Sequence, residues 1–118
     1  MNYVRIQATY NSKITGKPCG IFGALHGLLN RNKLSEHEQE VFTKVRTWFE
    51  ENLEQPDFYN EGNQIQGITW FKETSKDMID KLQPLTEILD NHSVEYELKT
   101  ETNPGKIVYE DEYQIGTI

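Results

Sequence analysis

The sequence predicts an α+β fold, a small antiparallel sheet with about three helices packed on one face. Two observations carry this prediction. Apolar and polar residues alternate in the segments 3–10 and 94–101, as in half-buried strands, whereas apolar residues recur about every 3.6 positions over 35–53, as in a helix. The resulting order, β-α-α-(β)-α-β-β, separates the helices from the sheet. The length of 118 residues fits one ligand-binding domain over 1–118.

The amino-terminal part is expected to form a strand, a loop and two helices. The strand covers 3–10, and the segment 11–18, rich in Lys, Thr and Gly, is predicted to be a loop. A short helix is expected over 20–30. The second helix begins at Ser35, because Ser35 and Glu38 have the spacing of a capping box, in which each side chain bonds a backbone N–H at the helix start.

The middle of the chain is less regular. A long polar loop is expected over 54–67, followed at 68–72 by a short strand or the lead-in to a helix. Apolar residues then stay on one face over 78–89, straight through Pro84. We expect one continuous helix kinked at Pro84, with two short helices as the alternative.

The carboxyl-terminal part is expected to be a pair of strands. Residues 94–101 alternate and form the first strand, and 107–118 form the return strand. Between them, Asn103-Pro104-Gly105-Lys106 has the signature of a type II turn, because Pro fixes φ and Gly accepts a positive φ.

Charge is distributed unevenly along the chain. The net charge is -7, yet all 19 acidic residues follow position 35, whereas five of the 12 basic residues precede it. Such asymmetry suggests a basic surface for an anionic partner on an otherwise acidic protein. The overall negative charge argues against general DNA or RNA binding, which needs a basic face.

The basic loop before the first helix is a candidate phosphate site. Free N–H groups at a helix start and two lysines favour an anion through the helix dipole and hydrogen bonds. The candidate ligands are Lys13, Thr15, Gly16, Lys17 and Gly20. The segment is not a Walker motif, since the first glycine and the Lys-Ser/Thr ending are missing. The alternative is a loop with solvated lysines.

Small residues also line one face of the first helix, at Gly20, Gly23, Ala24 and Gly27. Each glycine inside a helix costs about 1 kcal/mol relative to alanine, so a close approach by another group is expected. Packing within the chain and a subunit interface both fit, and we expect a homo-oligomer, a dimer or a multiple of one.

Aromatic side chains in and beside the long polar loop are candidates for stacking on a base. They are Phe58, Tyr59, Trp70 and Phe71. The alternative is that they close over the core. Asp111 is a further candidate, because alternation puts it on an apolar face, where it needs a partner such as Arg5 or a ligand hydroxyl. A bulge that turns it to solvent is the alternative.

Several other classes of function find little support. Cys19 lies at a helix start, but His26 is two helical turns away, so no nucleophile and base are paired, and we expect no enzymatic activity. No metal-ligand spacing is present, and neither a metal nor a cofactor is expected. With one cysteine and no long apolar run or signal-peptide pattern, a cytoplasmic location away from membranes is expected.

Four blocks together resemble phage and prophage proteins of the first Thoeris anti-defence family. They are GKPCGIFG (16–23), the helix over 35–53 ending in WFEENL, ITWFK (68–72) and PGKIVYEDEYQI (104–115). The resemblance spans nearly the whole chain in blocks of general similarity. It implies a non-catalytic protein of the bacterial host cytoplasm that sequesters cyclic ADP-ribose isomers made by TIR-domain enzymes, and in some members cyclic oligonucleotides.

The resemblance also implies homo-oligomers with ligand pockets at subunit interfaces. The chain is poor in arginine, and this argues against any phosphate contact of the family that depends on arginine. A different class of function fits the acidic composition: an inhibitor that docks on a host defence protein through an anionic face. The acid-free amino terminus argues against that alternative unless it is buried in an oligomer.

Overall fold

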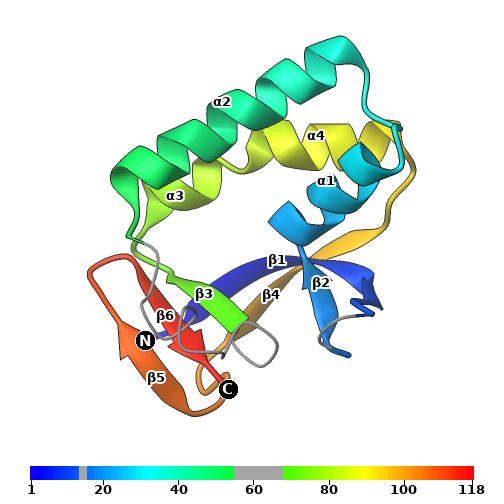
Figure 1. Cartoon of the computed structure of the whole chain (residues 1–118). Coiled ribbons are helices and arrows are strands. Elements are labelled where there is room, and N and C mark those ends of the chain that lie inside the picture. The colour runs from blue at the N-terminus through cyan, green and yellow to red at the C-terminus, as the bar shows by residue number, and fades with distance from the viewer. Residues whose placement is uncertain (14–15, 55–67) are drawn as a thin grey trace.

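The computed structural model describes residues 1–13, 16–54 and 68–118 and confirms the α+β class. A six-stranded antiparallel sheet carries the helices on one face (Figure 1). The strands are β1 (Tyr3–Asn11), β2 (Pro18–Gly20), β3 (Ile68–Lys72), β4 (Tyr96–Glu101), β5 (Ile107–Glu110) and β6 (Gln114–Thr117). The helices are α1 (Ile21–Asn30), α2 (Glu36–Asn52), α3 (Lys76–Asp80) and α4 (Gln83–Asn91).

β1 organises the sheet because both of its edges are occupied. β4 pairs with it from Tyr3 to Ala8. The opposite edge is shared, since β3 pairs beside Tyr3 and Val4 and β2 pairs from Gln7 onwards. β6 then pairs with β3, and β5 with β6. The shared edge leaves a seam between β2 and β3 beside the middle of β1.

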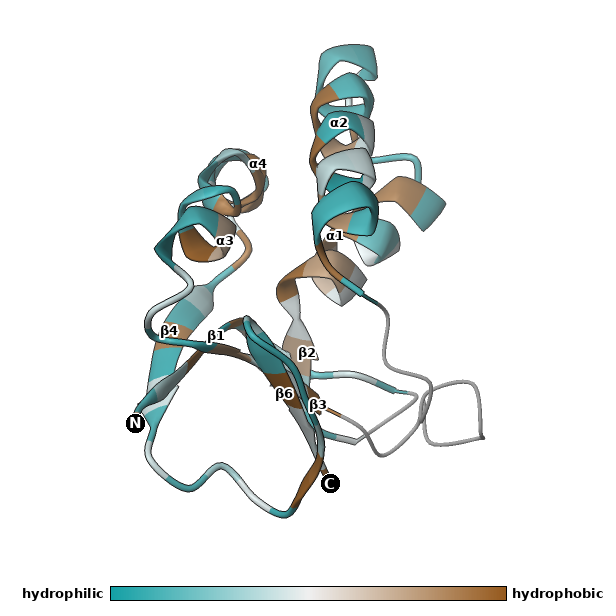
Figure 2. Cartoon of the chain, turned by 90° about the vertical axis from the view of Figure 1, so that its left-hand side faces the viewer, coloured by the Kyte–Doolittle hydropathy of each residue, from teal (hydrophilic) through white to brown (hydrophobic). Residues whose placement is uncertain are grey.

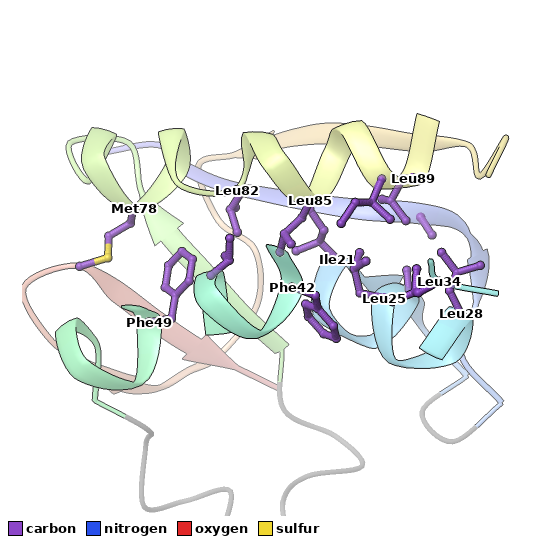
Figure 3. Close-up of a cluster of buried hydrophobic side chains, with 14 of the residues drawn as sticks. Ile21, Leu25, Leu28, Leu34, Phe42, Phe49, Met78, Leu82, Leu85 and Leu89 are labelled. Atoms are coloured by element: carbon purple, nitrogen blue, oxygen red, sulfur yellow. The ribbon is translucent and has the colours of Figure 1, made fainter. Parts of the chain in front are cut away.

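The core lies between the helices and the sheet. In Figure 2 the apolar sides of α2 and α4 face each other. Figure 3 shows side chains from α1, α2 and α4 pointing into the space between them, among them Leu25, Phe42, Leu85 and Leu89, each at most 1% exposed. Full burial of one such side chain stabilises the fold by about 1.5–3 kcal/mol.

The capping box at the start of α2 is confirmed. Glu38 N donates to Ser35 Oγ at 3.1 Å, and Ser35 N donates to Glu38 Oε1 at 2.9 Å. Both bonds satisfy N–H groups that have no partner within the helix. The open choice at 68–72 is also resolved, because these residues form the strand β3.

The prediction of one continuous helix through Pro84 is wrong. α3 ends at Asp80 and α4 begins at Gln83, so the two-helix alternative holds. Pro84 lies in the first turn of α4, where a helix needs no amide donor, whereas a continuous helix would require a Pro84 N–H to bond Asp80. Leu82 N instead donates to Ile79 O at 3.1 Å, which closes a tighter turn.

The loop predicted over 11–18 is shorter than expected. β1 continues to Asn11 and β2 begins at Pro18, so the two strands form a hairpin. Ser12 N donates to Lys17 O at 2.8 Å across its turn. Backbone pairing thus continues through residues whose composition alone indicated a loop.

The return strand predicted over 107–118 is two strands. β5 and β6 pair with each other around a turn at Asp111, and β4 pairs with β1 instead of β5. Gly105 does have the positive φ expected of it, +133°. However, Lys106 N donates to Ile118 O at 3.3 Å instead of closing the expected turn, so residues 102–106 link two separate strand pairs.

Candidate functional site

A pocket of about 860 Å³ lies between the sheet, α1 and α2. Its lining comes from parts of the chain that are far apart in sequence: β1 and β2, the first two turns of α1, the carboxyl-terminal half of α2, β3 and the start of β6. The volume lies within the range of about 300–1,000 Å³ that is typical of small-molecule sites. Of the predicted site residues, the pocket brings together Gly20 and Phe71.

The start of α1 forms one wall. Gly20 is the N-cap residue and makes no capping bond through a side chain, and Gly20, Ile21, Phe22 and Gly23 all line the pocket. The first N–H groups of a helix have no partner within the helix and carry its positive dipole end. This wall therefore presents hydrogen-bond donors to a ligand anion.

Arg5 lies beside this helix start, in the seam between β2 and β3. Its Nη1 donates to Thr69 O at 3.0 Å and its Nη2 to Pro18 O at 3.3 Å, so one guanidinium joins the two strands. Nε donates to Gln7 Oε1 at 3.1 Å, which fixes the remaining side of the guanidinium. A Cβ at Gly20 would lie 2.9 Å from Arg5 Nη2. Glycine at this N-cap lets the guanidinium reach the start of α1.

A second group with positive charge comes from α1 and α2. The rings of His26 and Phe42 pack edge to face with centroids 5.1 Å apart, and Arg46 Cζ lies 5.2 Å from the Phe42 centroid. Both His26 and Arg46 line the pocket. Partial burial, followed by the charge of Arg46, lowers the pKa of His26 below its ordinary value. Neutral His26 is therefore favoured while no anion lies beside it.

Three phenylalanine rings form the apolar side of the pocket. Phe22 and Phe49 pack edge to face with centroids 5.3 Å apart, and Phe49 and Phe71 lie 6.0 Å apart. The rings come from α1, α2 and β3, so helix and sheet packing together build this wall. Aromatic rings in such a wall can pack against a nucleobase or another planar group.

The predicted lysine ligands lie elsewhere. Lys13, Gly16 and Lys17 belong to the turn between β1 and β2, where Gly16 has a φ of +69° and its N donates to Ser12 O at 2.9 Å. None of the three lines the pocket, because β2 separates the turn from the start of α1. Thr15 lies outside the described residues. A phosphate role for this turn remains a prediction.

The predicted aromatic group is divided. Phe58 and Tyr59 lie outside the described residues. Trp70 and Phe71 are neighbours in β3 and therefore point to opposite faces of the sheet. Phe71 joins the core and the pocket, whereas Trp70 is paired with Ile115 and lies outside the core cluster. Trp70 is 7% exposed, and its Nε1 has no hydrogen-bond partner among the residues that the structure describes.

Asp111 ends β5 and organises the turn into β6. Its Oδ1 accepts the N–H groups of Tyr113 at 2.8 Å and Gln114 at 3.0 Å. Its Oδ2 accepts the Tyr109 hydroxyl at 2.7 Å and Gln114 Nε2 at 3.0 Å. These bonds outweigh the effect of partial burial and lower the pKa of Asp111. The carboxylate has neither the Arg5 partner nor the free solvated position considered for it, and its ligand role remains a prediction.

The glycine face of α1 contacts side chains of the same chain. A Cβ at Gly23 would lie 3.0 Å from Cys19 Sγ, and one at Gly27 would lie 3.4 Å from Arg31 Nη1. Together with Gly20 beneath Arg5, these contacts agree with the packing interpretation of the glycine stripe. The homo-oligomer remains a prediction, and the glycine face of α1 does not support it.

Other chemical sites find no support in the described part of the chain. No hydrogen bond there joins Cys19 to a histidine, and no group of three or more His, Cys, Asp or Glu side chains is placed to hold a metal ion. No helix in the described ranges is both long and apolar enough to cross a membrane.

Comparison of the chain with protein-family models, with curated proteins and with solved structures found no match. Only the geometry of the pocket and the chemistry of its lining residues therefore indicate what it could bind.

Sequence reasoning missed most of the pocket lining, including Arg5, His26, Arg46, Phe22 and Phe49. The period of α2 indicated that Phe49 is buried, and the alternation of β1 put Arg5 opposite the core-facing residues. Neither pattern indicates that one edge of β1 is shared by two strands. The seam that admits Arg5 is a property of the tertiary fold.

Proposed function

We propose that this chain binds and sequesters a small cyclic nucleotide of the cyclic ADP-ribose class without converting it. One observation carries the proposal: the start of α1 and the Arg5 guanidinium share a pocket with three phenylalanine rings. A cyclic nucleotide presents both phosphate oxygens, which need donors and positive charge, and planar bases, which favour aromatic neighbours.

Several features support this ligand class over a purely apolar one. Arg46 and His26 add to the donors of Arg5 and α1, so groups able to contact phosphate lie on more than one side of the pocket. Glu50 and Glu54 line it as well and would contact ligand hydroxyls better than phosphate. A ligand placed with its phosphates toward α1 and its sugars toward the end of α2 would match this distribution.

Sequestration instead of conversion follows the resemblance to the first Thoeris anti-defence family. Cys19, the only thiol of the chain, is not among the described residues that line the pocket. In this proposal the protein acts in the cytoplasm of the bacterial host cell and lowers the free concentration of an immune signal. No cofactor takes part.

Isothermal titration with cyclic ADP-ribose isomers tests the proposal. Arg46→Gln should weaken binding about tenfold, because one charged contact contributes about 1.5 kcal/mol. Lys44→Gln is the matched control, since Lys44 lies on the same helix, is exposed and does not line this pocket. The ligand should also be recovered intact after denaturation of the complex.

Other results would redirect or refute the proposal. Weakening by Lys17→Ala but not by Arg46→Gln would move the phosphate site to the turn between β1 and β2. Recovery of a cleaved ligand would indicate an enzyme. No binding of any isomer, together with a host polypeptide seen on the protein by native mass spectrometry, would favour the docking inhibitor.

A further inference from the structure

Gln114 is a buried polar side chain in one wall of the pocket. It begins β6, is 1% exposed, and lines the pocket together with Phe71 of β3. Phe71 and Gln114 lie directly opposite each other in the antiparallel pair of β3 and β6, so their side chains share one face of the sheet. A planar group packed against the phenylalanine rings would therefore have an edge beside the Gln114 amide.

Hydrogen bonds within the chain fix the orientation of this amide. Gln114 Nε2 donates to Glu54 O at 2.7 Å and to Asp111 Oδ2 at 3.0 Å, so both of its hydrogens are used. The reversed amide would put Oε1 against a carbonyl and a carboxylate, which are both acceptors. In the described part of the chain no donor is bonded to Oε1. Oε1 is therefore the polar atom that Gln114 can offer to a ligand, and it can only accept.

Asp111 makes this orientation the stable one. Partial burial alone would raise the pKa of Asp111, but the hydrogen bonds that the carboxylate accepts outweigh burial and lower it. The ionised carboxylate accepts through both oxygens, Oδ1 from the backbone N–H groups of Tyr113 and Gln114 and Oδ2 from the Gln114 amide. Asp111 is not among the described residues that line the pocket, so it acts on a ligand only through Gln114.

The cationic part of the pocket lies a short distance away along β3. Thr69, whose carbonyl oxygen accepts Arg5 Nη1 at 3.0 Å, precedes Phe71 by two residues in this strand. Two strand residues span about 7 Å, so the guanidinium and the Gln114 amide serve separate parts of one pocket. A ligand with an anionic group at one end and a hydrogen-bond donor on a planar ring at the other would contact both.

We propose that Gln114 Oε1 accepts a hydrogen bond from the exocyclic amino group of the ligand's base, and that Asp111 is the positioning residue that makes this contact selective. The inference rests on the proposed nucleotide pocket and names its base, which in the cyclic ADP-ribose class is adenine. A carbonyl at the same ring position, as in hypoxanthine, would put two acceptors against each other. The N1–H donor of hypoxanthine lies at another ring position, which the base could present only by shifting while its phosphates are held.

Isothermal titration of the wild-type chain with two matched ligands tests the assignment. One is a cyclic ADP-ribose isomer whose ring closure leaves the adenine edge free, and the other is its deaminated counterpart, which carries hypoxanthine. The amino ligand should bind about ten- to a hundredfold more tightly, because the hypoxanthine ligand leaves a buried acceptor without a donor. Affinities within about threefold of each other would overturn the assignment and leave the proposed function standing. Binding of neither ligand would refute the proposed function and this inference with it.

Asp111→Asn separates positioning from a purely structural role. The variant keeps Oδ1 for the two backbone N–H groups and replaces Oδ2 by an N–H donor, so the Gln114 amide can reverse and donate to the ligand. The preference for the amino ligand should fall to about threefold or less, chiefly because the hypoxanthine ligand binds more tightly. Loss of turn stability alone would weaken both ligands equally and keep the preference. A folded variant with the full wild-type preference would overturn the role of Asp111.

Two further variants complete the comparison. Glu112→Gln is the matched control, because it removes one carboxylate from an exposed residue of the same turn, and it should keep the wild-type preference. Gln114→Met removes both polar atoms of the amide at similar volume and should bind the two ligands about equally. Far-UV circular dichroism checks that each variant is folded. If Gln114→Met does not fold, the two ligands on the wild-type chain still decide the assignment.

Discussion

At the scale of single residues, Glu38 links two helices that are far apart in sequence. Its carboxylate accepts the Ser35 N–H in the capping box and also lies 2.9 Å from His92 Nε2, at the C-cap of α4. Burial raises the pKa of Glu38, but the bonds to Ser35 and His92 outweigh it, so the net pKa is lowered. The capping box was predictable from local spacing, whereas the His92 contact depends on how α4 packs beside α2.

The lowered pKa of Glu38 predicts a pH-dependent contribution to stability. A carboxyl group whose pKa is lower in the folded state stabilises the fold above its unfolded pKa, and this contribution is lost as the pH falls through the folded pKa. Glu38→Gln should therefore lower the free energy of unfolding by about 1 kcal/mol near pH 7. The difference should shrink as the pH is lowered to about 3, because the Glu38 carboxyl then takes up its proton in the folded state as well and loses the stabilising charge.

Urea denaturation at the two pH values measures this effect. Glu40→Gln is the control, because Glu40 is an exposed residue of the same helix. An equal loss at both pH values would mean that the Glu38 charge is not responsible.

At the scale of elements, sequence patterns predicted those features of helices and strands that depend on residues close together in the sequence. The period of α2, its capping box and the alternation of β1 and β4 were all evident in the sequence. The patterns failed where an element's partner lies far along the chain. β4 pairs with β1 instead of the adjacent β5. The interruption at Asp111 is a different failure, because the side-chain bonds that make it come from Tyr109 and Gln114, only two and three residues away, and apolar alternation does not report them.

α4 shows how apolar periodicity and tertiary packing combine. Leu85 is fully buried on its inner face, within the core formed with α1 and α2 (Figure 3). Leu85→Ala should lower the free energy of unfolding by about 2–5 kcal/mol, through lost burial and a cavity, with little change in helix propensity. Ile118→Ala, at a terminal residue that is 43% exposed, should change it far less.

Chemical denaturation of both variants gives the comparison. A loss below about 1 kcal/mol for Leu85→Ala would mean that α4 contributes little to the core.

At the scale of the whole molecule, the fold keeps the basic and the acidic parts of the sequence only partly apart. The acid-free segment builds β1, β2 and α1 and brings Arg5 and His26 to the pocket. α2 then adds Arg46 and Glu50, and Glu54 lies just beyond its end, so the pocket has cationic and acidic sides. Linear charge counting predicted a basic region but not these contributions from a largely acidic helix.

If the pocket binds the proposed ligand, this mixture of charges should make binding sensitive to pH through His26. Burial and the charge of Arg46 lower its pKa, so the folded protein binds a proton there less readily than the unfolded chain does. His26 therefore reduces stability as the pH falls below about 6.5, the ordinary value for histidine. A phosphate beside His26 would favour the charged form and reverse this effect in the complex.

Ligand binding should accordingly take up a proton and strengthen as the pH falls from about 8 to about 6, by up to about tenfold if the pKa rises by about one unit. His26→Asn cannot titrate and should show a nearly constant affinity over this range. His37→Asn, at an exposed residue of α2 outside the pocket, should keep the wild-type dependence. Titration calorimetry of a cyclic ADP-ribose isomer in two buffers of different ionisation enthalpy measures the proton uptake. Binding by the wild-type protein without proton uptake would place the phosphate away from His26, because a nearby anion must raise the pKa of that imidazole.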